Sequence, residues 1–303
     1  MSAHHVGFVS IAGRPNAGKS TLLNALIGEP IAITAHQAQT TRTAIQGVLN
    51  TPDAQIIFID TPGIHKSDTL LNRRMMETVR SALLDRDLIL FVVDATRATT
   101  EEDEHALSAV SKSAKAFLVL NKVDRVEDKP LLLPLIEHYV ARFPFLNSVP
   151  ISARTGEGLD NLKRLIIEAL PEGEPLFPSD YLTDQPLRFM AAEIIREQIL
   201  RVTREEVPHS TAILIDKWEE TEGLTKIAAT IHVERPGQKI ILIGKGGQVL
   251  KQIGTGARHR LERLLESKVF LSLFIKVKPN WREDPSFLNV IDWRAMLGSE
   301  REE

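Results

Sequence analysis

The stretch GRPNAGKS, residues 13–20, constrains the fold of this chain more than any other. It matches the pattern G-x-x-x-x-G-K-[ST], and it lies between the apolar run 6–12 and the helix-like run 19–28. The two glycines let successive backbone N–H groups wrap a phosphate, and a helix N-terminus adds its positive dipole. We therefore predict a phosphate loop in which Lys19 reaches the β- and γ-phosphates and Ser20 ligates Mg²⁺.

The first half of the chain alternates between short apolar runs and longer amphipathic ones. Predicted strands cover residues 6–12, 54–60, 88–94, 116–122 and 148–152. Predicted helices cover residues 19–28, 70–84, 101–113, 129–142 and 159–170. This alternation predicts an α/β domain with a mostly parallel sheet covered on both faces, and such sheets bind ligands at the carboxyl ends of their strands. At 303 residues, of which 43% are apolar, the chain has room for about two such cores.

A second motif, DTPG at residues 60–63, ends the strand 54–60. A carboxylate at a strand tip beside a phosphate loop can hold Mg²⁺ through a water, so Asp60 is predicted to do so. Gly63 is predicted to bring its backbone N–H to the γ-phosphate. The next residue is Ile64, which cannot hydrogen-bond a water as a glutamine would, so we expect slow unaided hydrolysis.

A third motif, NKVD at residues 121–124, selects the base. The Asp124 carboxylate can accept both the N1–H and the N2–H₂ of guanine, a donor pair that adenine lacks. We expect the stem of Lys122 to lie flat over the base and a backbone N–H near Ser152 and Ala153 to reach guanine O6. The predicted nucleotide-binding residues are Gly13, Arg14, Pro15, Asn16, Ala17, Gly18, Lys19, Ser20, Thr21, Asp60, Thr61, Pro62, Gly63, Ile64, Asn121, Lys122, Asp124, Ser152 and Ala153.

The pattern changes after a proline-rich stretch. We expect a nucleotide-binding domain over residues 1–172, a linker over 173–186 and a second domain over 187–303. In the second domain, residues 187–206 have the apolar stripe of a helix, and 226–233 and 269–278 alternate as half-exposed strands.

The second domain contains G-x-x-G at Gly244, Lys245, Gly246 and Gly247, between two helical segments. Residues 239–282 hold ten Lys or Arg and two Glu, a net charge of +8 in a chain whose total is −3. The order helix, strand, strand, helix, loop, helix, strand resembles a type II KH domain, an α+β fold that binds single-stranded RNA. Residues expected to bind RNA are Gly244, Lys245, Gly246, Gly247, Lys251, Arg258, Lys276 and Lys278, with Arg260 also in the positive groove. The alternative is a basic helical hairpin that only packs on the first domain.

GRPNAGKST, DTPGI, NKVD and SAR look like the G1, G3, G4 and G5 elements of a translation-factor-type GTPase, and AQTTRT (38–43) resembles the G2 switch. Together with the KH-like domain they resemble the Era family over nearly the whole chain. The resemblance implies a P-loop GTPase that binds GTP and GDP, uses Mg²⁺, recognises 16S rRNA near its 3′ end and acts on the small ribosomal subunit. It also implies peripheral contact with the inner face of the cell membrane. Lys19, Thr41 and Gly63 are the expected catalytic residues, and Ser20, Thr41 and Asp60 the expected Mg²⁺ site, with Thr40 as the alternative to Thr41.

Asn16 suggests a further cofactor. Its side-chain oxygen stands three residues before Lys19, where GTPases with a matching asparagine use K⁺ to stabilise the transition state. Arg14 is expected to point to solvent, so we do not expect it to stabilise the transition state. The alternative is that Asn16 only caps the loop.

Other functions fit the sequence less well. A P-loop kinase should lack N-K-x-D, and a tRNA-modifying GTPase would need a catalytic cysteine or folate site, whereas the chain has no cysteine. A membrane-surface GTPase without an RNA role would not need the Gly-rich loop. The absence of cysteine, signal segment and membrane span fits a cytoplasmic protein, and we expect a monomer.

Overall fold

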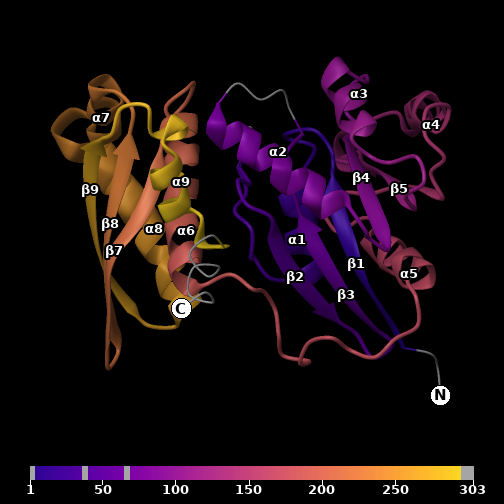
Figure 1. Cartoon of the computed structure of the whole chain (residues 1–303), viewed down its shortest axis with the longest axis horizontal. Coiled ribbons are helices and arrows are strands. Elements are labelled where there is room, and N and C mark those ends of the chain that lie inside the picture. The colour runs from indigo at the N-terminus through magenta and orange to yellow at the C-terminus, as the bar shows by residue number, and fades with distance from the viewer. Residues whose placement is uncertain (1–3, 36–39, 65–68, 295–303) are drawn as a thin grey trace. The chain divides into compact units, whose positions relative to one another are not determined.

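The computed structural model describes residues 4–35, 40–64 and 69–294 (Figure 1). The chain divides into two compact units, with the boundary in the main chain between Asp184 and Gln185. Within the described residues, no helix is long and apolar enough to cross a membrane.

The first unit is built on a six-stranded sheet in the order β2-β3-β1-β4-β5-β6. Its strands are β1 (His5–Ala12), β2 (Ile45–Asn50), β3 (Ala54–Asp60), β4 (Leu88–Asp94), β5 (Ala116–Asn121) and β6 (Asn147–Pro150). Only β2 runs antiparallel to its neighbour, and the other pairings are parallel. The carboxyl ends of β1, β3, β4 and β5 therefore meet at one edge, where all the predicted nucleotide motifs follow.

Helices cover both faces of this sheet (Figure 1). They are α1 (Lys19–Ile27), α2 (Leu70–Leu83), α3 (Glu101–Ser108), α4 (Leu132–Val140) and α5 (Leu159–Ala169). Apolar side chains of α1 and α5 form one buried cluster with one face of the strands, and side chains of α2, α3 and α4 form another with the opposite face. The two cores explain why β3, β4 and β5 are continuous apolar runs that are buried along their whole length.

The proline-rich segment before residue 185 packs on the first unit. The backbone N–H of Val48 donates to the Leu182 carbonyl at 2.9 Å, and the Gln55 side chain donates to the Phe177 carbonyl at 2.8 Å. Phe177 and Tyr181 stack at 4.7 Å beside a small apolar cluster on β1, β2 and β3. This segment therefore covers the open edge of β2.

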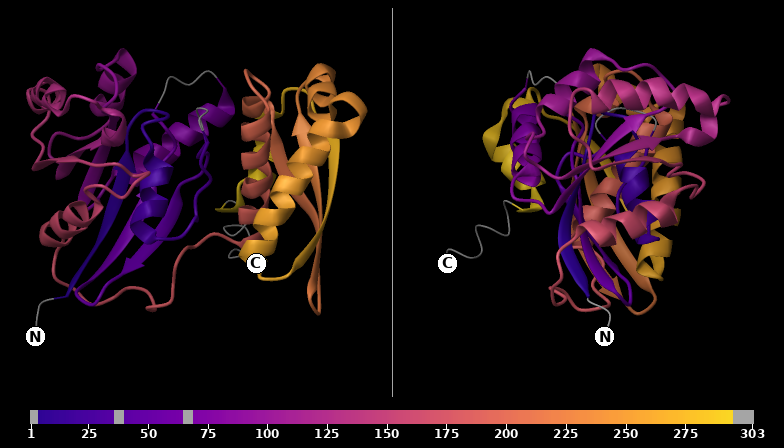
Figure 2. Two further views of the ribbon diagram at one scale, coloured as in Figure 1. Left: turned by 180° about the vertical axis from the view of Figure 1, so that it is seen from behind. Right: turned by 90° about the vertical axis from the view of Figure 1, so that its right-hand side faces the viewer.

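The second unit has a three-stranded sheet in the order β7-β8-β9, with α6, α7 and α8 on one face (Figure 2). Its elements are α6 (Leu187–Val202), β7 (Ala212–Thr221), β8 (Leu224–Val233), α7 (Pro236–Ile243), α8 (Gln248–Leu265), β9 (Lys268–Val277) and α9 (Pro285–Ile291). β8 runs antiparallel to β7 and parallel to β9. The predicted order of elements and the fold class are confirmed.

Some predicted boundaries are wrong. The helix expected to reach residue 206 ends at Val202, where Thr203 adopts an extended conformation and its hydroxyl donates to the Ile199 carbonyl. The helix expected over 101–113 ends at Ser108, and that expected over 129–142 is a 3-10 turn over 129–131 followed by α4.

Candidate functional sites

The phosphate loop, residues 13–20, joins β1 to α1, as predicted. The Lys19 ammonium is buried and donates to the carbonyls of Gly13 at 3.1 Å and Arg14 at 3.0 Å. Burial penalises its charge and lowers its pKa to about 8, although nearby Asp60 opposes the shift. Lys19 is therefore held inside the loop, where a phosphate would offer it the anionic partner that the carbonyls do not.

Three predicted magnesium ligands converge beside this loop. One Asp60 oxygen, Oδ2, accepts hydrogen bonds from the hydroxyls of Ser20 at 2.7 Å and Thr41 at 3.0 Å, and those hydroxyls lie 2.9 Å apart. The other oxygen, Oδ1, is buried and has no hydrogen-bond partner among the described residues. Burial raises the pKa of Asp60 above its ordinary value, although Lys19 opposes the shift. A buried carboxylate oxygen with an unused lone pair, beside two hydroxyls, is the hard-oxygen set that suits Mg²⁺.

The DTPG motif lies directly against the phosphate loop. A side chain on Gly63 would put its Cβ 2.7 Å from Cα of Pro15, so only glycine fits this approach. The N–H of Ile64 donates to the Gly13 carbonyl at 3.3 Å, and the Ile64 side chain is buried in the core. Ile64 therefore presents no polar group to a nucleotide.

Asn121 ties three of the motifs together. Its Nδ2 donates to the Ala17 carbonyl in the phosphate loop at 2.9 Å, and its Oδ1 accepts from the Ala153 N–H at 3.0 Å and the Lys122 N–H at 2.8 Å. Asn121 is itself buried. Its amide thus fixes the distance between the phosphate loop and the two loops predicted to bind the base.

Asp124 presents its carboxylate at the predicted base position. Oδ1 accepts from the Ser152 hydroxyl at 2.7 Å, and Oδ2 accepts from the Arg154 guanidinium at 2.5 Å. These bonds, led by that of Ser152, hold the pKa of Asp124 below its ordinary value. Arg154 was not among the predicted site residues, although it directly follows Ser152 and Ala153. Its side chain is 73% exposed, so it can move aside when another donor approaches Asp124.

Arg14 does not point to solvent, and that expectation was wrong. Its side chain is 6% exposed, and its Nε lies 2.9 Å from Asp103 Oδ1 while Nη2 lies 3.7 Å from Asp94 Oδ2. Asp94 and Asp103 are also buried, and buried carboxylates require cationic partners. This pairing turns Arg14 away from the solvent and joins the phosphate loop to α3.

Asp94, at the end of β4, is a second residue that the sequence analysis missed. It accepts from the Lys122 ammonium at 2.7 Å, and that ammonium also donates to the Asn16 carbonyl at 2.6 Å. Burial alone would raise the pKa of Asp94, but the hydrogen bonds from Lys122 and Thr96 outweigh burial and lower it. The signal available in the sequence was an aspartate at the end of a predicted strand.

Other predicted nucleotide residues take local roles. The Thr61 hydroxyl donates to the Ile11 carbonyl at 2.8 Å, and Asn16 is exposed with a φ of 63°. Residues 38 and 39 of the predicted switch lie outside the described residues, whereas Thr40 and Thr41 lie within them. Of these two threonines, Thr41 is the one whose hydroxyl meets Ser20 and Asp60.

In the second unit, the Gly-rich loop 244–247 joins α7 to α8 (Figure 1). Lys245, Lys251 and Lys276 are exposed. Lys278 instead forms an ion pair with Asp284 at 2.8 Å. Arg260 is also paired, with the buried Glu197 of α6, so its expected place in the positive groove was wrong.

The fold and these sites define a P-loop GTPase joined to a KH domain. Residues 8–122 match the family model described as "50S ribosome-binding GTPase", and residues 206–282 match the model described as "KH domain". The chain is 51% identical to GTPase Era of Geobacter metallireducens over 290 residues, which is 95% of this chain and 97% of that relative. The chain belongs to the GTPase Era family.

Solved structures of Era proteins are also similar to this chain. A crystal structure of Era in complex with MgGDPNP and nucleotides 1506-1542 of 16S ribosomal RNA is 43% identical, with a TM-score of 0.92 over 95% of this chain and 98% of that one. A crystal structure of a variant of Aquifex aeolicus Era bound to GDP.AlF4- is 42% identical, with a TM-score of 0.91 over the same shares. The sequence-based assignment to this family is confirmed.

Proposed function

We propose that the first unit binds Mg²⁺ and GTP through the residues that converge on the phosphate loop, and that the second unit binds 16S rRNA near its 3′ end. The observation that carries the nucleotide assignment is the Asn121 amide, which holds the phosphate loop and the base-binding loops together. In the second unit, the supporting observation is the exposed Gly-rich loop between α7 and α8, which lies within the segment 239–282 that has a net charge of +8. The relative crystallised with a segment of 16S rRNA supports the choice of RNA.

The proposed roles at the phosphates follow from position. Mg²⁺ would be held by Ser20 and Thr41 directly and by Asp60 through a water, and it would supply positive charge to the phosphate oxygens. Lys19 exchanges its loop carbonyls for the β- and γ-phosphates, and Gly63 offers its N–H to the γ-phosphate. Ile64 cannot orient the attacking water, so unaided hydrolysis is slow.

The proposed roles at the base follow from hydrogen bonding. Asp124 accepts from guanine N1–H and N2–H₂ once Arg154 moves aside, and Ser152 keeps the carboxylate oriented. Lys122 spans from β5 to the Asn16 carbonyl, so its stem lies beside the base position. The Ala153 N–H is held by Asn121, so another backbone N–H beside Ala153 would reach guanine O6.

We further propose a division into a GTP-binding domain over residues 1–172, a linker over 173–186 and an RNA-binding domain over 187–303. In this scheme the protein is a cytoplasmic monomer that assists maturation of the small ribosomal subunit. The basic surface of the second unit also supports a weaker contact with an anionic membrane. K⁺ held by Asn16 is a further proposal, supported by the exposed position of that residue in the phosphate loop.

Crosslinking the chain to RNA in cell extract and sequencing the trapped fragment tests this function. We expect fragments from the 3′ end of 16S rRNA. Fragments from 23S rRNA would contradict the assignment to the small subunit and would favour the large-subunit role in the description of the matched GTPase model.

A further inference from the structure

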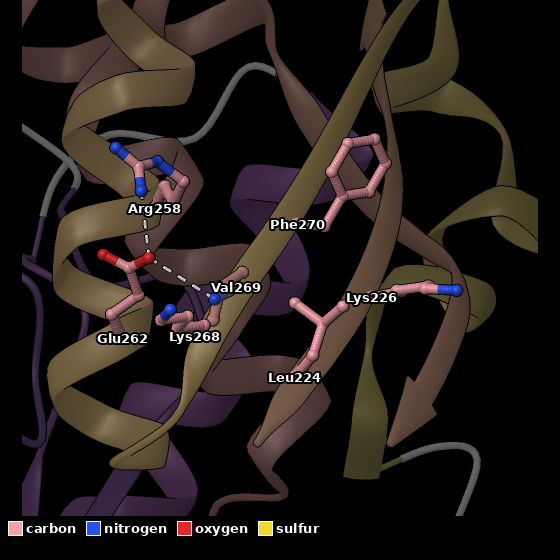
Figure 3. A pocket seen from close by; sticks show the side chains of 7 residues that line it. All are labelled: Leu224, Lys226, Arg258, Glu262, Lys268, Val269 and Phe270. Carbon is pink, nitrogen blue, oxygen red and sulfur yellow. Dashed lines mark hydrogen bonds and ion pairs between the residues drawn. The ribbon is translucent and has the colours of Figure 1, made fainter. Parts of the chain in front are cut away.

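A hollow of about 520 Å³ lies beside the start of β9, on the second unit (Figure 3). It is lined from the C-terminal half of α8, from the start of β9 and from the start of β8. Its lining residues are Leu224, Lys226, Arg258, Glu262, Lys268, Val269 and Phe270. Of these residues, only Arg258 was predicted to bind RNA.

The floor of the hollow offers an aromatic face. Phe270 is 59% exposed, and it makes no aromatic or cation–π contact within the part of the chain that the structure describes. Figure 3 shows its ring projecting from β9 on the side away from Glu262 and Arg258. Exposing a large aromatic ring costs free energy unless a partner covers it, and nucleic-acid bases stack well on such rings.

The rim of the hollow carries uncompensated positive charge. Lys226 and Lys268 are exposed, and neither forms an ion pair with another described residue. Glu262 is the one carboxylate in the lining, and it is already engaged: its Oε1 accepts from Arg258 at 3.0 Å and from the Val269 N–H at 3.4 Å. Glu262 thus satisfies a backbone donor on the outer edge of β9 and leaves the two lysines available to an anion.

The α8 side of the hollow, at Arg258, also continues the predicted RNA groove. A Cβ on Gly254 would lie 3.5 Å from Leu273, so this side of α8 faces β9, and Arg258 follows one turn later on the same side. Arg258 stands eleven residues after Gly247, about 16 Å along the helix. A strand clamped at the Gly-rich loop would have to extend beyond its four clamped nucleotides to reach this position.

We propose that this hollow binds one nucleotide of the same single-stranded RNA, with the base stacked on Phe270 and a phosphate attracted by Lys226, which extends to the same side of β9 as the Phe270 ring (Figure 3). The proposal rests on the RNA-binding function proposed above and adds a subsite to it. Base stacking supplies contact that tolerates different bases, and the lysines supply attraction to the backbone.

The test measures the affinity of the full chain for nested oligonucleotides of about 4, 8 and 12 nucleotides, cut from the 16S rRNA segment 1506-1542 and extended in either direction. We expect the affinity of wild-type protein to rise with RNA length. Phe270→Ala should lower the affinity for the longer RNAs by about tenfold and leave the affinity for the shortest RNA unchanged. Phe270→Trp should keep the rise. Lys226→Gln should lower only the affinity for the longer RNAs, whereas Lys112→Gln, at an exposed lysine of the first unit, should change nothing.

Phe274→Ala is the matched control, because Phe274 is 56% exposed on the same face of β9 but does not line the hollow. Equal losses in the two alanine variants would overturn the proposal in favour of a general sheet-surface contact. Normal length dependence in Phe270→Ala, or a change only in binding to vesicles of anionic lipid, would also overturn it. If wild-type protein bound none of the RNAs, the proposed function itself would fail.

Discussion

The cations closest to the phosphate loop are held by protein groups, whereas the lysines closest to the Gly-rich loop are exposed, although Arg258, Arg260 and Lys278 elsewhere in the second unit are paired. In the first unit the cations beside the phosphate loop are held by protein groups: Lys19 by two carbonyls, Arg14 by Asp103, and Lys122 by Asp94. In the second unit Lys245 and Lys251 beside the Gly-rich loop are exposed, and so are Lys226 and Lys268 at the hollow.

The difference matches the ligand that each unit is proposed to take. Charges fixed by buried partners are already oriented, so they suit one small ligand of defined shape. Exposed lysines adapt to a long polyanion, and their attraction is weakened by salt. A substitution in one unit should therefore change that unit alone and leave ligand binding by the other unit unchanged.

The largest expected effect is loss of RNA binding in Gly246→Asp. A side chain there has open space around it, so the fold should persist, although a φ of 60° is strained for aspartate. Its charge repels the RNA backbone at the point of closest approach. We expect RNA affinity to fall by more than about 100-fold and GTP affinity to stay unchanged. Gly28→Asp is the control, because Gly28 also has a positive φ and open surroundings. Normal RNA affinity in Gly246→Asp would contradict the KH assignment.

Asp94→Asn should damage the first unit alone. The change leaves the Lys122 ammonium without its buried carboxylate and leaves Arg14 with Asp103 alone, so the free energy of unfolding of this unit should drop by about 3 kcal/mol. Tyrosine fluorescence during denaturant unfolding reports on it, since both tyrosines, Tyr139 and Tyr181, lie in the first unit.

The matched control uses the same carboxylate. Arg97 lies 3.7 Å from Asp94 but is 60% exposed, so Arg97→Gln should change the free energy of unfolding by less than about 0.5 kcal/mol. Equal effects of Asp94→Asn and Arg97→Gln would contradict the importance of the buried pairing.

Asp124→Asn should change base preference. An amide suits the 2-oxo group of xanthine, whereas a carboxylate suits the two guanine donors, so preference should move from GTP toward xanthosine triphosphate by more than about tenfold. Competition binding measures the ratio, and RNA binding serves as the internal control. The guanine assignment is wrong if GTP still competes as it does with wild-type protein.

The smallest expected effect is on the choice of monovalent cation. If Asn16 holds K⁺ between the phosphates, GTP hydrolysis at fixed ionic strength should be several-fold faster in KCl than in NaCl. Asn16→Ala should lose that advantage. Equal wild-type rates in the two salts would remove K⁺ from the mechanism.

The sequence allowed the chemistry of the site to be predicted because phosphate, Mg²⁺ and guanine each require particular side chains at fixed spacing. Ser20, Asp60 and Thr41 are far apart in the chain, yet they meet as predicted because each lies at the same edge of a parallel sheet. The support around the site was harder to predict. Arg14 is buried because Asp103 and Asp94 lie beside it, and those partners are far along the chain from the phosphate loop.

Edge strands and buried polar side chains were also hard to predict from local sequence. Residues 45–50 form the outermost strand β2, whose side chains are only partly buried and whose apolar pattern is short. On α6, Arg196 and Glu197 are almost fully buried, and Arg196 pairs with Glu193 while Glu197 pairs with Arg201 and Arg260. Polarity alone would have placed both residues in solvent.

One titration tests the contrast between the units most directly. The affinities of the same wild-type sample for GTP, at fixed Mg²⁺, and for a 16S rRNA oligonucleotide are measured between about 50 and 200 mM salt. We predict that RNA affinity falls by at least about tenfold, because exposed lysines release counterions, while GTP affinity changes much less. Parallel losses for the two ligands would contradict the account, since they would mean that both sites depend on exposed, screened charge.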